Sequence, residues 1–70
     1  MGERKRITMI QPKIYYHIET DKSNRFKNTI EEALKTVQYF YNKGHTNIKL
    51  WKDYEYFKNE IVTELLLKIN

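Results

Sequence analysis

The strongest constraint on the fold of this chain lies in its middle, where residues 28–43 have the periodicity of an amphipathic helix. Apolar side chains recur there at helical spacing, at Ile30, Ala33, Leu34, Val37, Phe40 and Tyr41. Asn28 and Thr29 each have a glutamate three residues on, which is the capping-box arrangement at a helix start. Gly44 stands where a left-handed residue commonly ends a helix. The sequence therefore predicts one helix over residues 28–43.

The segments on either side of this helix have the composition of β-strands. Residues 13–19 are rich in β-branched and aromatic side chains, and residues 48–52 alternate between apolar and polar positions. Residues 6–10 also have strand composition, but Pro12, which lacks a backbone N–H, follows them closely. Residues 21–24 form a polar cluster that is typical of a turn. We therefore expect two or three strands.

The C-terminal segment fits two structures. As a helix over residues 54–69, it has Asp53 as its N-cap and a continuous apolar stripe along one side. The pair Glu64 and Lys68, at the helical spacing i, i+4, also favours a helix. As a hairpin, residues 58–59 make the turn and alternate positions after them are apolar or β-branched. The cap and the length of the stripe favour the helix, which is our prediction.

Together these elements predict an α+β or α/β miniature with a two- to three-stranded sheet. The helix over residues 28–43 and the C-terminal helix over residues 54–69 would pack on this sheet, in the order (β)–β–α–β–α. The strand–helix–strand run from residue 13 to residue 52 fits a right-handed crossover between parallel strands. Residues 1–5 are expected to be a disordered basic tail, and residues 6–70 a single small domain.

The composition excludes several classes of protein. A chain of 70 residues without cysteine rules out a disulfide-stapled scaffold, a cysteine-ligated zinc site and a cysteine nucleophile. Two glycines, Gly2 and Gly44, cannot form a P-loop or a dinucleotide-binding fingerprint. His17 and His45 are isolated and lack the spacing of metal ligands. We therefore predict no catalytic residue, no metal site and no small-molecule cofactor.

An enzyme would need a cleft that brings Glu19, Asp21 or Asp53 next to a histidine, and this class ranks last. No apolar run approaches the length of a membrane span, and the N-terminus lacks the apolar core of a secretory signal. These two features predict a cytoplasmic protein that does not associate with membranes.

The formal charge of +4 is unevenly distributed. Residues 1–13 have a net charge of +3, whereas residues 14–70, with nine basic and eight acidic side chains, have a net charge of +1. A duplex-binding protein usually spreads its phosphate contacts over one face, so this distribution weakens that interpretation. Nucleic-acid binding by a basic arm and an aromatic–basic sheet face is kept as the alternative function. Its contact residues would be Arg4, Lys5, Arg6, Lys13, Lys49 and Lys52.

Strand alternation separates an aromatic surface from the expected core. Ile14, Tyr16 and Ile18 alternate with Tyr15 and His17, and the isoleucine face should meet the helix. If the strands 13–19 and 48–52 are neighbours, Tyr15, His17, Lys49 and Trp51 share the opposite face. Such a patch is typical of a protein interface or of stacking on single-stranded nucleic acid. The alternative is that the C-terminal helix covers this face and Trp51 belongs to the core.

These observations favour a small non-catalytic accessory or regulatory protein that binds another protein or a second copy of itself. The chain has more tyrosines than a small core can bury with satisfied hydroxyl groups. Abundant Lys, Ile and Asn with a single Ala fit AT-rich codons, which favours an origin in a phage or mobile element of a low-GC bacterium. The predicted protein-contact residues are Tyr15, His17, Tyr39, Trp51, Tyr54 and Tyr56.

Overall fold

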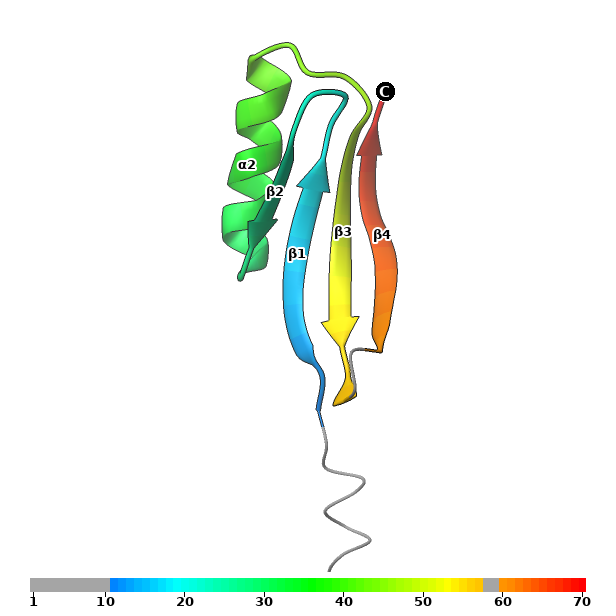
Figure 1. Ribbon diagram of the computed structural model, residues 1–70. Coiled ribbons are helices and arrows are strands. Elements are labelled where there is room, and N and C mark those ends of the chain that lie inside the picture. The colour runs from blue at the N-terminus through cyan, green and yellow to red at the C-terminus, as the bar shows by residue number, and fades with distance from the viewer. Residues whose placement is uncertain (1–10, 58–59) are drawn as a thin grey trace, which may run out of the picture.

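A computed structural model describes residues 11–57 and 60–70 and shows a four-stranded antiparallel sheet with one helix. Along the chain the elements are β1 (Lys13–Glu19), β2 (Asn24–Lys27), α2 (Ile30–Asn42), β3 (Ile48–Glu55) and β4 (Ile61–Ile69). The spatial order of the strands is β2-β1-β3-β4, so β2 and β4 form the two edges (Figure 1). The protein is thus a small α+β fold.

This architecture corrects the predicted fold in its strand count, its helix count and its connections. The predicted two- to three-stranded sheet with two helices is wrong, because residues 11–57 and 60–70 form four strands and one helix. The parallel crossover is also wrong, since β1 and β3 pair antiparallel along their whole length. The strand predicted at residues 6–10 lies outside the described residues.

The predicted helix is confirmed apart from its ends. Thr29 is the N-cap, and its side-chain oxygen accepts a hydrogen bond from the backbone N–H of Glu32 at 3.2 Å. Glu31 and Glu32 lie in the first turn, where negative charge interacts favourably with the helix dipole. At the other end Gly44 has a φ of +89°, the left-handed conformation in which glycine is favoured because it has no Cβ.

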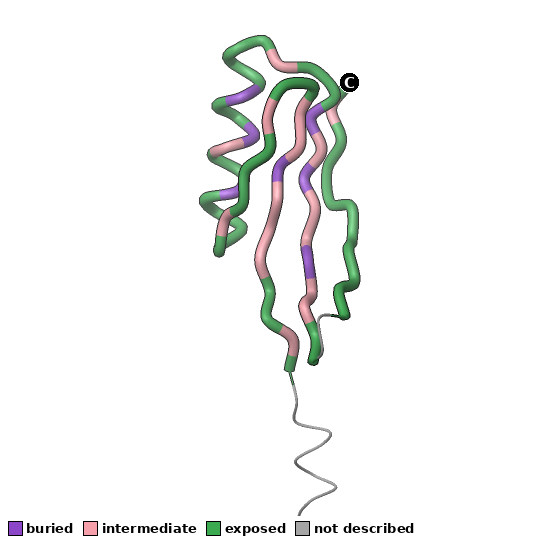
Figure 2. The backbone as a smooth tube through the Cα atoms, in the orientation of Figure 1, coloured by how far each residue is buried: buried purple, intermediate pink, exposed green. Residues whose placement is uncertain are grey.

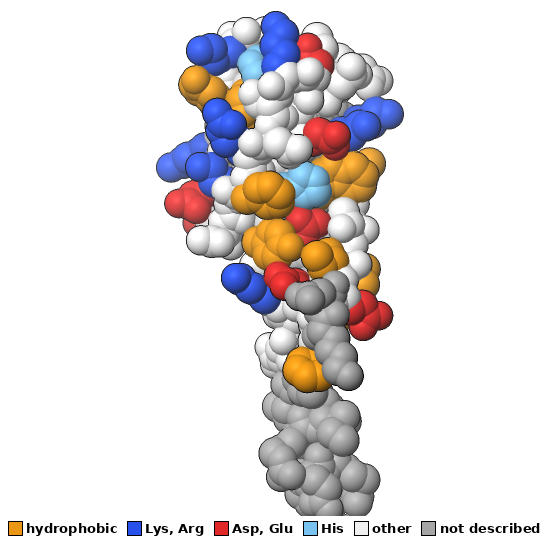
Figure 3. Space-filling view, in the orientation of Figure 1, with side chains coloured by type: hydrophobic (Ala, Val, Ile, Leu, Met, Phe, Trp, Pro, Cys, Tyr) orange, Lys and Arg blue, Asp and Glu red, His pale blue; other side chains and the backbone are white. Residues whose placement is uncertain are grey.

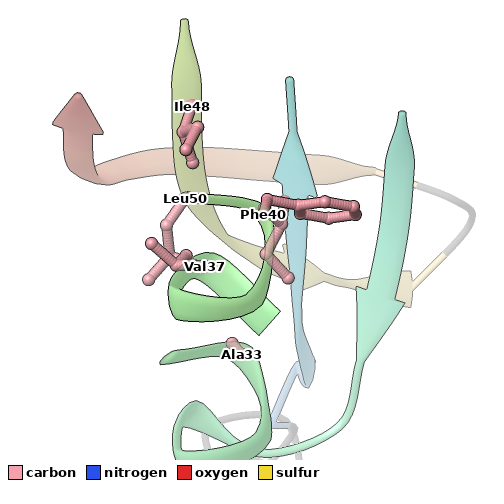
Figure 4. Packing of buried hydrophobic residues seen from close by; sticks show 6 residues of the cluster. Ala33, Val37, Phe40, Ile48 and Leu50 are labelled. Atoms are coloured by element: carbon pink, nitrogen blue, oxygen red, sulfur yellow. The ribbon is translucent and has the colours of Figure 1, made fainter. Parts of the chain in front are cut away.

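The core lies between α2 and one face of the sheet. Ala33, Val37 and Phe40 point from the helix toward the strands, as Figure 4 shows. They meet Ile48 and Leu50 of β3, together with Ile18 of β1. Buried positions therefore gather at the upper, helix-covered end of the molecule in Figure 2, while β4 is almost wholly exposed. The prediction that the isoleucine face of the strands meets the helix is confirmed for these central positions.

Strand β2 was not predicted, and it adds Phe26 to the sheet. The β1–β2 turn is closed by a 2.8 Å hydrogen bond from the N–H of Thr20 to the carbonyl of Ser23. The Thr20 hydroxyl oxygen also accepts hydrogen bonds from the backbone N–H groups of Lys22 and Ser23. Phe26 of β2 pairs with His17 of β1 and lies on the face of the sheet opposite α2.

The C-terminal segment forms a strand, so the predicted helix over residues 54–69 is wrong. The hairpin alternative is correct in its strand, whereas its turn at residues 58–59 lies outside the described residues. Strand β4 pairs antiparallel with β3 along its length, after a loop in which the N–H of Tyr56 bonds to the carbonyl of Glu60. Asp53, predicted to be an N-cap, is a buried residue inside β3. Pairing with β3 supplies backbone hydrogen bonds and cross-strand packing that the helical spacing of the apolar residues does not reveal.

Candidate functional site

The face of the sheet opposite α2 has a row of rings that crosses three strands. His17 of β1 pairs with Phe26 of β2 on one side and with Trp51 of β3 on the other. The His17 ring lies 5.4 Å from the Phe26 ring and 5.9 Å from the Trp51 ring, the latter in a stacked arrangement with an interplanar angle of 17°. Leu65 of β4 lies beside Trp51 and continues the row across the fourth strand. We call this uncovered surface the open face.

Hydrophobic side chains surround a histidine over the middle of the strands in the view of Figure 3, which looks onto the open face. Phe26 is 63% exposed although it contacts two rings, those of His17 and Tyr15. The Tyr15 ring lies 6.1 Å from that of Phe26 and widens the aromatic surface toward the next row of the sheet. No described helix covers this face, because α2 lies against the other one.

A buried carboxylate lies beneath the ring row and links three strands. Asp53 is only 4% exposed, and its Oδ2 lies 2.9 Å from Nδ1 of His17. Its second oxygen, Oδ1, accepts a hydrogen bond from the hydroxyl of Thr63 at 3.0 Å. Because a carboxylate only accepts hydrogen bonds, Nδ1 of His17 is the donor, and Nε2 is left for another partner. Both carboxylate oxygens are thus satisfied, and the His17 ring is held in one orientation.

Two further polar contacts define the rim of the open face. The indole N–H of Trp51 donates to Glu19 at 3.4 Å, which orients the indole across the β1–β3 pair. Desolvation by burial and, to a lesser extent, the carboxylates of Glu55 and Asp53 raise the pKa of Tyr15 above its ordinary value. The Tyr15 hydroxyl therefore stays neutral at physiological pH and can donate a hydrogen bond.

The lysines predicted to contact nucleic acid lie opposite carboxylates in the sheet. Lys13 pairs with Glu55 and Lys49 pairs with Glu19, so these two positions add no net charge to the open face. Lys52 lies on the helix-covered side opposite Glu64, with its Nζ 5.0 Å from the centre of the Tyr54 ring. A hydrogen bond with Tyr54 is the main cause that raises the pKa of Lys52. Arg4, Lys5 and Arg6 lie outside the described residues.

The structure brings together three of the six predicted protein-contact residues. Tyr15, His17 and Trp51 share the open face, as strand alternation predicted. Tyr39 is exposed on α2, and Tyr54 lies with Lys52 on the helix-covered side of the sheet. Tyr56 follows the end of β3, outside the ring row. These three tyrosines do not belong to the open face.

Four residues that form or support the open face were not identified from the sequence: Phe26, Leu65, Asp53 and Thr63. Phe26 is the only apolar residue of a four-residue strand, so its segment gave no periodicity to detect. Leu65 and Thr63 would have been found from the hairpin interpretation of the C-terminal segment, in which alternate residues share one face. The approach of Asp53 to His17 depends on the β1–β3 register, which the sequence does not specify.

A second feature is a basic groove of about 360 Å³ between β2 and α2. Arg25 and Lys27 of β2 line it together with Lys35, Thr36, Tyr39 and Phe40 of α2. The Arg25 guanidinium lies 5.7 Å from the centre of the Phe40 ring. Among the described residues, none of the groove's three cations forms an ion pair with a carboxylate. Basic side chains gather along this side of the molecule in Figure 3.

Comparison with protein families, with curated proteins and with solved structures found no match for this chain. In residues 11–57 and 60–70, no group of three His, Asp or Glu side chains is placed to hold a metal ion. Over the same residues, α2 does not have the length and apolar character needed to cross a membrane. The open face and the basic groove are therefore the features on which a function can be argued.

Proposed function

We propose that this protein is a non-catalytic accessory or regulatory protein that binds another protein through its open face. The observation that carries this proposal is the row formed by Phe26, His17 and Trp51 across three adjacent strands on the side of the sheet opposite α2. Tryptophan and tyrosine are enriched among the residues that dominate binding energy at protein interfaces. A cytoplasmic setting, in a phage or mobile element, is part of the same proposal.

The open face is rigid enough to recognise a partner without a large ordering cost. The hydrogen bonds of Asp53 to His17 and Thr63 fix the centre of the surface, and that of Trp51 to Glu19 fixes its rim. Pre-organised side chains lose little conformational entropy on binding, which favours affinity. His17 Nε2 offers a polar contact in the middle of an apolar patch, as specific interfaces commonly do.

The balance of charge on this face favours a protein partner over nucleic acid. Lys68 also lies on the open face, opposite Lys49, but Lys13 and Lys49 each lie directly opposite a glutamate. Binding to phosphates requires cations that can replace counterions, and these two lysines are already beside carboxylates. A near-neutral aromatic surface matches the composition of interface cores, where charged residues are depleted.

The pair of His17 and Asp53 has the geometry that an acid–base catalyst would need, but its surroundings favour a structural role. His17 lies on the open face between the tilted ring of Phe26 and the stacked ring of Trp51, with Asp53 buried beside it, whereas the basic groove lies on the other side of β2. General acid–base catalysis depends on a site that encloses the substrate around the catalytic groups. Satisfying a buried carboxylate accounts for the His17 contact without catalysis.

A photo-crosslinking amino acid at position 26 tests the proposal in the native host, with the same probe at position 41 as a matched control. Phe26 and Tyr41 are similarly exposed, at 63% and 57%, but Tyr41 lies on α2. We expect one discrete crosslinked protein from position 26 and none from position 41. Excess wild-type protein should compete for this product, while excess Phe26→Ser protein should not.

Two outcomes would contradict the proposal. Equal crosslinking from both positions would indicate non-specific contact. A product from position 26 that contains only this chain would assign the open face to self-association instead of partner binding.

Nucleic-acid binding remains a second candidate, and the basic groove is the observation that favours it. Its cations, Arg25, Lys27 and Lys35, form no ion pair among the described residues and line one groove together. The test is oligonucleotide affinity measured at several salt concentrations. The double variant Arg25→Gln/Lys27→Gln should reduce the slope of log affinity against log salt by about 2.

The matched control for the groove is the double variant Lys13→Gln/Lys49→Gln, which also removes two positive charges but acts on the open face. Equal effects of the two double variants would show that only total charge matters. No binding of wild-type protein to single-stranded or duplex oligonucleotides at low salt would exclude this candidate function.

A further inference from the structure

Strand β4 presents an unpaired edge along its whole length. It pairs with β3 on one side only, and the strand order leaves its other side without a neighbour in the described chain. Eight of its nine residues are exposed, all except Ile69. An edge of this length offers a row of free backbone N–H and C=O groups to another strand.

The side chains of β4 are apolar on both faces of the sheet. Ile61 and Leu65 lie on the open face, because they pair with Glu55 and Trp51. Val62 and Leu67 lie on the other face, where α2 packs on β1, β2 and β3 toward the opposite edge (Figure 1). All four apolar side chains are between 36% and 50% exposed. A strand that covers β4 would therefore bury apolar surface above and below the sheet.

The edge has few of the features that usually prevent strands from pairing. It contains no proline, and its single lysine, Lys68, lies next to its last residue. Its one negative charge, on Glu64, balances the positive charge of Lys68. Two paired copies of β4 would therefore not repel each other through net charge. One irregularity is present: Leu66 is an extra residue between the partners of Leu50 and Trp51.

We propose that a second copy of this chain pairs with β4, antiparallel, to form a symmetric dimer with a continuous sheet. The occupant must be a strand with apolar side chains on both faces and no net charge, and β4 itself has both properties. A twofold axis uses the same surface on each copy, which is the commonest arrangement of soluble dimers. No further copies add to the sheet of the dimer, because its outer edges are the two β2 strands. Each β2 strand has only four residues and carries Arg25 and Lys27.

The mass of the protein in solution, measured over a range of concentrations, tests this proposal. Wild-type protein should reach twice 8.6 kDa as concentration rises. The variant Leu66→Lys should weaken the dimer by at least about tenfold, since the symmetric pairing would bring two new positive charges together. Leu66 suits this test because it has no partner in β3. Its replacement should therefore disturb the β3–β4 pairing within one copy less than a replacement at a paired position.

The matched control is Phe26→Lys, which places a lysine at an exposed apolar position on the other edge strand. This variant should leave the dimer mass unchanged. A folded wild-type protein that stays at 8.6 kDa at all concentrations would overturn the proposal. A dimer that is lost with Phe26→Lys and retained with Leu66→Lys would overturn it too, because it would assign the interface to the open face.

A cysteine scan covers the case in which Leu66→Lys does not fold. The natural chain has no cysteine, so a single cysteine at each β4 position in turn can form a disulfide only between two copies. Paired strands should give a maximum of disulfide yield at one or two neighbouring positions, where the Cα atoms come within about 7 Å. A uniformly low yield along β4, equal to that of Phe26→Cys, would contradict the proposal.

Discussion

The two edges of this sheet differ in length, in charge and in what covers them. Strand β2 has four residues, and its Arg25 and Lys27 line the groove against α2. Strand β4 has nine residues, six of which are Ile, Val or Leu, and α2 packs toward the opposite side of the sheet. A short, charged and flanked edge resists pairing with another chain, whereas a long apolar edge favours it. In the proposed dimer, association therefore uses the β4 side of the molecule.

This difference also affects how the open face would meet a partner. Pairing of β4 about a twofold axis perpendicular to the sheet leaves both open faces on the same side of the extended sheet. Two rows of Phe26, His17 and Trp51 would then be displayed on one surface. A target with two matching sites would bind such a dimer more tightly than one copy, through effective concentration alone.

The largest expected effect concerns the helix that covers the β2 side. Phe40 is 2% exposed and packs from α2 into the buried cluster. Phe40→Ala should lower the free energy of unfolding by about 3–5 kcal/mol, because it removes a buried ring and leaves a cavity. Urea denaturation at one fixed protein concentration measures this loss. Tyr41→Ala, at an exposed neighbouring position, should change the free energy of unfolding by less than about 0.5 kcal/mol.

A loss below 1 kcal/mol for Phe40→Ala would show that α2 does not hold the β2 side of the sheet. The two edges would then differ only in sequence, and the protection of β2 by the helix would be contradicted.

A smaller effect is expected at the centre of the open face. Asp53→Ala removes the acceptor of both His17 and Thr63, so we expect a loss of about 2 kcal/mol in the free energy of unfolding. Asp53→Asn keeps the shape and one acceptor oxygen, and it should cost less. Thermal unfolding of both variants at one pH measures the difference. Equal losses would indicate that the hydrogen bonds of the carboxylate do not stabilise this face.

The side-chain hydrogen bond from Thr63 of β4 to Asp53 of β3 should contribute less to the free energy of unfolding. Thr63→Val removes the hydroxyl that bonds to buried Asp53 while keeping the shape of the side chain, so it should cost about 1 kcal/mol. Thr36→Val on α2 is the control, since the Thr36 hydroxyl donates to the Glu32 carbonyl at an exposed position. Denaturant unfolding of both variants should show a loss only for Thr63→Val, and comparable losses would contradict the special role of the β4 contact.

The smallest expected effect is a pH dependence near the protected edge. The N–H of Thr46 donates to Asp21 Oδ1 at 3.0 Å, and this bond is the main cause that lowers the pKa of Asp21 below its ordinary value. Because the folded pKa is lower than the unfolded one, the stabilisation is fully present above the ordinary pKa. It is lost as the pH falls below about 4, through the lowered folded pKa.

Unfolding measured between pH 2 and pH 7 for Asp21→Asn checks this assignment. The variant should lose part of the decline in stability that wild-type protein shows below about pH 4. Parallel stability curves for the variant and the wild type would assign that decline to other carboxyl groups.

The sequence was sufficient to predict an element where its apolar residues fitted the spacing of a helix or the alternation of a strand, but not both. Residues 30–42 repeat at helical spacing and start at a recognisable cap, and residues 13–19 alternate, so both elements were predicted. The same alternation placed Tyr15 and His17 on one face, and the assumption that the strands 13–19 and 48–52 are neighbours added Trp51.

Sequence patterns were insufficient where the pairing of strands decides the structure. Residues 61–69 have apolar side chains at consecutive positions, which fit a helical stripe and a strand equally well. Asp53 resembles an N-cap until β3 extends through it, and only the register brings it to His17. Strand β2, with Phe26 as its one apolar side chain, exists because β1 provides a partner.

Backbone hydrogen exchange tests the central claim, the difference between the two edges, most directly. The β4 amides that do not bond to β3 should become protected as the protein concentration is raised through the range in which the mass doubles. The outward amides of β2 should exchange rapidly at every concentration, because no described strand pairs with that edge and the proposed dimer does not use it. Equal protection of both edges, or β4 amides that exchange rapidly at all concentrations, would contradict the account.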